Sequence, residues 1–231
     1  MPVTVDNSAI GPGGAGVTLT ITGFTPGATA NALYVGVGYV DAVDTVASVT
    51  WNGGTESFTS LFDAGPSNQA VSGWLLLNPT ITTANIVVTF TAATSAENAG
   101  VVSLIGVKTA AGVAGAHRTL FSASGSSATA TVDVTDCVIG DLVIDTACVA
   151  SSTITVGPGQ TSQAEDDSIG GGSRSMGIST EVAVGATTTM SWTLTSNAWT
   201  IEAFALVADD GTPITGLGRK HMGFNYARPY L

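Results

Sequence analysis

Residues 199–207 read WTIEAFALV, and this stretch decides the fold class because apolar side chains occupy both faces of a single strand. Alternate residues of a β-strand point to opposite faces. One face would carry Trp199, Ile201, Ala203, Ala205 and Val207, and the other Phe204 and Leu206 beside Glu202. A strand that is apolar on both faces predicts either the centre of a β-sandwich or an interface on its outer face.

The rest of the chain consists of short runs rich in valine, threonine, isoleucine and aromatic residues, separated by clusters of glycine, proline, asparagine and aspartate. No segment has convincing helical periodicity, so the pattern predicts an all-β protein. Asn52-Gly53 predicts a hairpin, because both residues tolerate a positive φ, and residues 163–172 predict an exposed loop. Strands are expected over 17–22, 32–40, 46–51, 55–61, 70–77, 84–91, 99–107, 118–123, 128–135, 141–150, 152–157, 175–184, 187–195 and 199–207.

The two halves of the chain carry expected strands of similar order and length, at an offset of roughly 100 to 109 residues. Their sequence identity is low, so a true internal duplication and the ordinary regularity of β sequences both stay open. We expect a jelly-roll-like antiparallel β-sandwich over residues 17–210, preceded by an N-terminal arm over residues 1–16. Its pseudo-repeated halves would span about residues 17–107 and 128–207.

The chain is poor in charge, and most of its charges are negative. Its 231 residues include 6 Lys or Arg against 17 Asp or Glu, which gives a formal charge of -11. Residues 1–107 contain no Lys or Arg, which argues against a nucleic-acid partner because phosphate binding needs clustered basic residues. No apolar run approaches the roughly 18 residues that span a bilayer, so we expect no membrane protein. A hydrophobic content of 44% argues against disorder.

The charge reverses at the C-terminus. Residues 211–231 contain no acid, so the body has 17 acidic against 3 basic residues, a charge of -14, and the tail carries +3. Arginine and aromatic residues are enriched at the centres of protein interfaces. We predict an extended C-terminal arm, which could dock on a neighbouring subunit or scaffold, fold onto its own sandwich, or be disordered. Its predicted interface residues are Arg219, Lys220, Met222, Phe224, Tyr226, Arg228, Tyr230 and Leu231.

Catalytic motifs are weak in this sequence. Gly11, Gly13 and Gly16 fit G-x-G-x-x-G, but a strand follows them where nucleotide binding requires the start of a helix. A Ser-His-Asp triad could be drawn through His117, although an ordinary surface histidine beside Arg118 is the favoured interpretation. We therefore expect a non-enzymatic protein that holds no cofactor.

Three groups of residues have both a structural and a functional interpretation. Loop acids could bind Ca²⁺, but none has EF-hand spacing, so solvated acids are favoured over calcium. Cys137 and Cys148 are expected to be buried thiols rather than a disulfide or zinc ligands. The tryptophans could stack on sugars, although core packing is favoured for each. The acid groups are Asp41 with Asp44, Asp136 with Asp141, Glu165 to Asp167, and Asp209 with Asp210; the tryptophans are Trp51, Trp74, Trp192 and Trp199.

The sequence resembles β-sandwich modules of bacteriophage structural proteins and bacterial surface proteins. The resemblance covers residues 17–207 and rests on the order and spacing of hairpins and strands rather than on a functional site. It is carried by SVTWNGGTESF, VSGWLLLNP and AGVVSLIGV in the first half, and by GDLVIDTACV and AWTIEAFALV in the second.

This resemblance implies a non-enzymatic virion component, with a capsid decoration or cement protein as the first expectation. A tail-fibre or surface adhesin that binds host glycans is the alternative. The partners would be further copies of the chain, a trimer by analogy of fold alone, and a capsid or other virion scaffold. The N-terminus lacks the features of a signal peptide, so we expect assembly in the host cytoplasm rather than secretion by that route.

Overall fold

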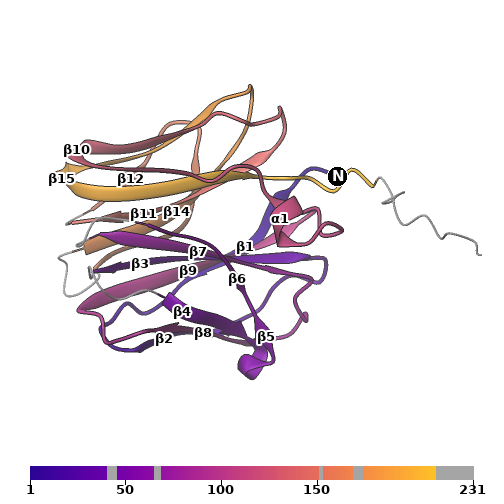
Figure 1. Cartoon of the computed structure of the whole chain (residues 1–231), viewed down its shortest axis with the longest axis horizontal. Coiled ribbons are helices and arrows are strands. Elements are labelled where there is room, and N and C mark those ends of the chain that lie inside the picture. The colour runs from indigo at the N-terminus through magenta and orange to yellow at the C-terminus, as the bar shows by residue number, and fades with distance from the viewer. Residues whose placement is uncertain (41–45, 65–68, 151–152, 169–173, 212–231) are drawn as a thin grey trace, which may run out of the picture.

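Three antiparallel sheets lie in layers in the structure of the protein (Figure 1). The structure is a computed structural model, and it describes residues 1–40, 46–64, 69–150, 153–168 and 174–211. The predicted antiparallel β-sandwich is therefore confirmed. The central sheet has the strand order β1 (Thr4–Ile10), β9 (Ala96–Ile105), β3 (Ala32–Val40), β7 (Ala70–Leu77) and β6 (Thr59–Ala64).

The central sheet is covered by a smaller sheet on one face and a larger sheet on the other (Figure 1). The smaller, N-terminal sheet has the order β2 (Thr18–Phe24), β8 (Ala84–Phe90), β4 (Val46–Trp51) and β5 (Glu56–Ser57), with the short helix η1 (Asn52–Gly54) between β4 and β5. The C-terminal sheet has the order β10 (Phe121–Val134), β15 (Thr188–Leu206), β11 (Leu142–Val149), β14 (Arg174–Val182) and β13 (Thr161–Ser168), and β12 (Thr155–Val156) pairs with β15. One helix, α1 (Val113–Ala116), lies in the connection between the halves.

The two halves of the chain share one pairing order. In the central sheet it is β1-β9-β3-β7-β6, and in the C-terminal sheet it is β10-β15-β11-β14-β13. Moreover, β8 pairs with β4 just as the first part of β15 pairs with β12. The long strands β10 and β15 thus each take the place of two strands of the first half, which is the relation that an internal duplication would produce.

Three differences from the expected strands have physical causes. Residues 4–10, which we assigned to an N-terminal arm, form β1 and pair with β9. The expected loop at residues 163–172 is wrong in its first part, because the polar strand β13 covers 161–168 at a sheet edge, where polar residues are usual. The expected breaks inside β10 and β15 are absent because their serine-rich and asparagine-containing segments pair with each other.

Apolar side chains fill both spaces between the layers and a third space on the outer face of the C-terminal sheet. Trp51 and Ile86 are buried between the N-terminal and central sheets. Tyr34 and Phe204 pack edge to face between the central and C-terminal sheets. Trp192, which is fully buried, belongs to the third cluster, on the outer face of the C-terminal sheet.

Strand β15 contributes to two of these cores. Ile201, Ala203 and Ala205 lie in the outer cluster, whereas Phe204 and Leu206 face the central sheet. The expectation that residues 199–207 are apolar on both faces because they lie at the centre of the sandwich is confirmed. The hairpin predicted at Asn52-Gly53 is also confirmed, because β4 pairs with β5 and both turn residues have a positive φ.

Candidate assembly interface

The described strands bring one end of all three layers together, and we call it the tail end. Ala32 at the start of β3 pairs with both Leu77 and Leu104, and Leu142 at the start of β11 pairs with both Val182 and Leu206. The bridge between Val107 and Ala208 joins the central and C-terminal sheets there. The N-terminus lies at this same end (Figure 1), and Gly211, the last described residue, lines one hollow together with Met1.

Exposed large apolar side chains gather at the tail end. Among the described residues seven such side chains are exposed, and only Val17, beside the end of β8, lies at the opposite end. Val184 is 82% exposed and Ile139 is 75% exposed. The six at the tail end are Met1, Ile81, Val138, Ile139, Val182 and Val184.

Four of these six side chains lie on two neighbouring segments, and we call them the apolar rim: Val138, Ile139, Val182 and Val184. The turn before β11 runs alongside the segment that follows β14. The Gly140 amide donates to the Ala183 carbonyl at 2.8 Å, and the Ala183 amide donates to the Asp141 carbonyl at 2.9 Å. These bonds hold the two segments that carry the apolar side chains next to each other.

An ion pair fixes the turn that carries half of the rim. Arg118 Nε donates to Asp141 Oδ2 at 2.5 Å, and the same carboxylate oxygen accepts the Val138 amide at 2.8 Å. The hydrogen bond to Asp141 raises the pKa of Arg118. Because this turn is already ordered, binding at the rim costs little further ordering of the turn itself.

A hollow of about 330 Å³ adjoins the rim and shares Val182 and Val184 with it. Leu142 adds an apolar wall, and the hydroxyl-bearing residues Thr161 and Thr180 also line it. Glu181 is the ionisable residue in this lining, and burial raises the pKa of its carboxyl group. The hollow therefore combines an apolar wall with a single partly desolvated acid.

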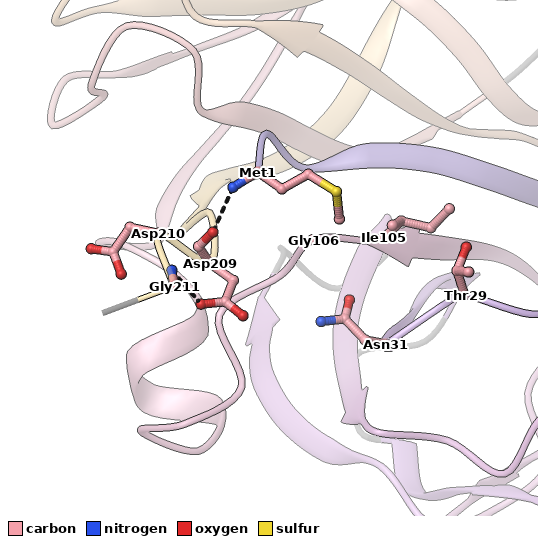
Figure 2. A pocket seen from close by; sticks show the side chains of 8 residues that line it. All are labelled: Met1, Thr29, Asn31, Ile105, Gly106, Asp209, Asp210 and Gly211. Atoms are coloured by element: carbon pink, nitrogen blue, oxygen red, sulfur yellow. Dashed lines mark hydrogen bonds between the residues drawn. The ribbon is translucent and has the colours of Figure 1, made fainter. Parts of the chain in front are cut away.

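A second hollow, of about 360 Å³, lies where the described chain ends, and Figure 2 shows its lining residues. The Met1 ammonium donates to the Asp209 carbonyl at 2.7 Å, and the Gly211 amide donates to Asp209 Oδ1 at 3.0 Å. The Asp209 amide donates to the Gly106 carbonyl at 2.8 Å. The last described residues are thus fastened to the connection that leaves the central sheet.

The predicted arm lies almost wholly outside the described residues. Gly211 is its first residue and the only one that the structure describes. The predicted interface residues lie beyond it: Arg219, Lys220, Met222, Phe224, Tyr226, Arg228, Tyr230 and Leu231.

The structure places His117 in the link between the halves. Its ring packs edge to face on Phe204 with the centroids 5.7 Å apart, and Nδ1 donates to the Arg118 carbonyl at 2.6 Å. The side chain is half-buried rather than on the open surface, because the bridge to Leu206 draws this segment onto the sheet. These contacts serve packing, and none of them is to a serine or a carboxylate.

The sugar-stacking interpretation of the tryptophans does not fit their burial. All four are 7% exposed or less, and each indole N–H has an acceptor. Trp192, for example, donates to Asp145 Oδ2 at 3.1 Å. The favoured interpretation, core packing, is confirmed for every tryptophan of the chain.

Cys137 and Cys148 are buried free thiols, as expected. They lie on opposite sides of the C-terminal sheet, because Cys137 belongs to the outer core and Cys148 faces Gly38 of the central sheet. Burial raises the pKa of Cys148 to about 12. Both side chains therefore behave as small apolar groups.

The expected loop acids have defined partners where the structure describes them. Asp136 Oδ2 accepts the Thr119 amide at 2.9 Å, and Asp167 Oδ1 accepts the Ile154 amide at 3.0 Å. Glu165 to Asp167 lie in strand β13 rather than in a loop, and Asp41 and Asp44 lie outside the described part of the chain. No group of three or more acids, histidines or cysteines with metal-binding geometry occurs among the described residues, and no described helix is long and apolar enough to cross a membrane.

Three buried acids were not anticipated. Burial raises the pKa of Glu97 and of Asp145 to about 7, and burial together with the charge of Asp63 raises that of Glu202 to about 8. Asp145 accepts hydrogen bonds from the Ser179 amide and from the Trp192 indole N–H. In contrast, Glu97 and Glu202 each have one buried carboxylate oxygen without a hydrogen-bond partner. The burial of Glu202 could have been predicted from the sequence, because residues 199–207 are apolar on both faces and Glu202 shares one of them with Phe204 and Leu206.

Comparison with known proteins adds no further constraint on this site. No family model, no curated protein and no solved structure matches the chain.

Proposed function

We propose that this chain is a non-enzymatic structural protein of a virus particle, and that it decorates and cements a bacteriophage capsid through subunit contacts. The observation that carries the proposal is the tail end, where exposed apolar side chains stand beside the start of a basic and aromatic segment. Clusters of exposed apolar residues mark interaction sites, because water disfavours them on an isolated monomer.

The rest of the described molecule suits a rigid building block. Its three apolar cores and paired strands give a body that needs no ligand to bury its hydrophobic residues. A low content of charge reduces the desolvation that subunit contact would cost. The chain would associate with further copies of itself and with a capsid or other virion scaffold, and its stability would be shared among subunits.

The test is the number of copies of the chain on purified particles, measured by quantitative mass spectrometry. The full chain should be present at a fixed number per particle, and a variant that lacks residues 212–231 should be absent from particles although circular dichroism shows a folded sandwich. Unchanged occupancy of the shortened variant would refute the role of the arm. Absence of the full chain from particles would refute the proposal itself.

A glycan array separates the alternative function, an adhesin that binds host sugars. A cement protein should show no saturable binding to any glycan. Saturable binding that persists without residues 212–231 would favour the adhesin, with a platform other than the four buried tryptophans.

A further inference from the structure

We propose that the apolar rim and its adjoining hollow receive residues 219–231 of a neighbouring copy of this chain. The inference deepens the proposed function and rests on it only in assigning the contact to self-association. Three observations carry it: the ordered rim, the chemistry of the hollow beside it, and the residue pattern of the arm.

The rim offers exposed apolar surface to a docking segment. Its four side chains are between 54% and 82% exposed. Exposed apolar patches of this kind mark interaction sites, and these four residues could contact several side chains of an extended segment.

The arm has the alternation that such a segment needs. Every second residue from 220 to 230 is large and is basic, apolar or aromatic, whereas the intervening residues from 221 to 229 are smaller, apart from His221. Alternate residues of an extended chain lie on one side. One side of the arm would therefore present, in order, Lys220, Met222, Phe224, Tyr226, Arg228 and Tyr230.

The chemistry of the hollow matches that side of the arm. An aromatic ring can occupy the space beside Leu142 and Val182, where it would remove apolar surface from water. Glu181 is the acid in the lining, and its burial disfavours the charged form unless a cation approaches. Arg228, between two tyrosines at alternate positions, supplies a cation together with flanking rings.

The described chain ends within reach of a neighbouring copy. The last described residues are tied to Gly106 and Met1, whereas the rim lies at the start of β11 and the end of β14. The twenty residues that follow Gly211 reach up to about 66 Å when extended, which is long enough to meet the rim of an adjacent copy. The choice of a neighbour over the arm's own sandwich rests on the proposed function.

Limited trypsin digestion of the purified full chain tests the proposal, because Arg219 and Lys220 are cleavage sites within the arm. Cleavage there should be at least tenfold slower at high protein concentration than at high dilution, and sedimentation should show an oligomer over the same range. Val184→Asp and Ile139→Asp should remove the protection and the oligomer. Both side chains are more than 70% exposed, so the sandwich should stay folded, which circular dichroism checks.

Val17→Asp is the matched control, since Val17 is an exposed valine at the opposite end and should change neither protection nor mass. Protection that does not depend on concentration would mean that the arm docks on its own sandwich, and this would overturn the assignment to a neighbour. Cleavage as fast as in a free peptide, or protection that survives Val184→Asp, would overturn the rim as the docking surface. Particle occupancy is not involved, so the proposal can fail while the role in the virion stands.

Discussion

Replacing Glu202 by glutamine should stabilise the protein at neutral and alkaline pH. The side chain is 3% exposed, one carboxylate oxygen has no hydrogen-bond partner, and it lies on the face of β15 that packs on the central sheet. Burial, with the charge of Asp63, raises the pKa of this carboxyl group from 4.5 to about 8. The folded protein therefore holds a proton that the unfolded chain releases.

The sign and size of the effect follow from this difference in pKa. Between pH 4.5 and about 8 the folded state binds more protons than the unfolded state, so stability falls as the pH rises through this window and levels off above it. One pKa unit corresponds to about 1.4 kcal/mol, so the ceiling is about 5 kcal/mol. Local rearrangement and water relieve part of this cost, and we expect Glu202→Gln to gain about 2 to 3 kcal/mol above pH 8.

Urea unfolding and thermal melts between pH 4 and 9 measure the effect. The Tm of Glu202→Gln should exceed that of the natural chain by about 5 to 10 °C at pH 8.5 and match it near pH 4.5. Glu56→Gln is the control, because the Glu56 carboxylate accepts the exposed Thr80 amide at 3.0 Å and its replacement should give no gain. A loss of stability in Glu202→Gln at pH 8.5 would refute the reasoning, because it would mean that the buried carboxylate is favourably solvated.

Three further predictions concern packing and charge. Gly177→Ala should lower the free energy of unfolding in urea by at least about 2 kcal/mol, because an added Cβ would lie 2.4 Å from the Trp192 ring. Gly14→Ala is the control: no atom lies within 4 Å of its added Cβ, so it should lower the free energy of unfolding by less than about 1 kcal/mol. Arg118→Ala should destabilise the protein by about 2 kcal/mol, because it leaves the Asp141 carboxylate, which is 7% exposed, without its cation. Adding Asp141→Asn should recover part of this loss, and no recovery would contradict a stabilising ion pair. Cys137 and Cys148 should react with Ellman's reagent at pH 8 only after denaturation, and rapid reaction of either thiol in the folded protein would contradict their burial.

The sequence predicts the apolar strands well because their side-chain pattern alone determines where they must lie. Residues 32–40, 46–51 and 70–77 form strands with the expected bounds. The polar strands β1 and β13 were missed, because they are held by backbone pairing with β9 and β14 rather than by burial of both faces. No residue pattern within either segment reports that pairing.

The candidate site was only half accessible to sequence reasoning. The arm was identified from its charge and its aromatic content, because both can be counted directly from the sequence. The rim was hidden because Val182 and Val184 continue an apolar strand pattern, and the expected strand ran to residue 184. Their exposure depends on where β14 ends, at Val182, and on the turn at 138–139 that packs beside them. The buried acids were hidden for the same reason, since their depth follows from layer packing.

The shared pairing order of the halves offers an internal comparison that bears on the rim. The connection before β11 carries Val138 and Ile139, whereas the equivalent connection before β3, residues 25–31, has only small and polar residues. The last residue of β14 and the segment after it expose two valines, Val182 and Val184, whereas the equivalent segment after β7 exposes one large apolar side chain, Ile81. The first half reaches the same pairing order without a rim, so the fold does not require these exposed side chains. Exposed apolar residues cost solubility and give nothing to the sandwich, so their concentration in the half that leads into the arm agrees with the contact proposed at that end.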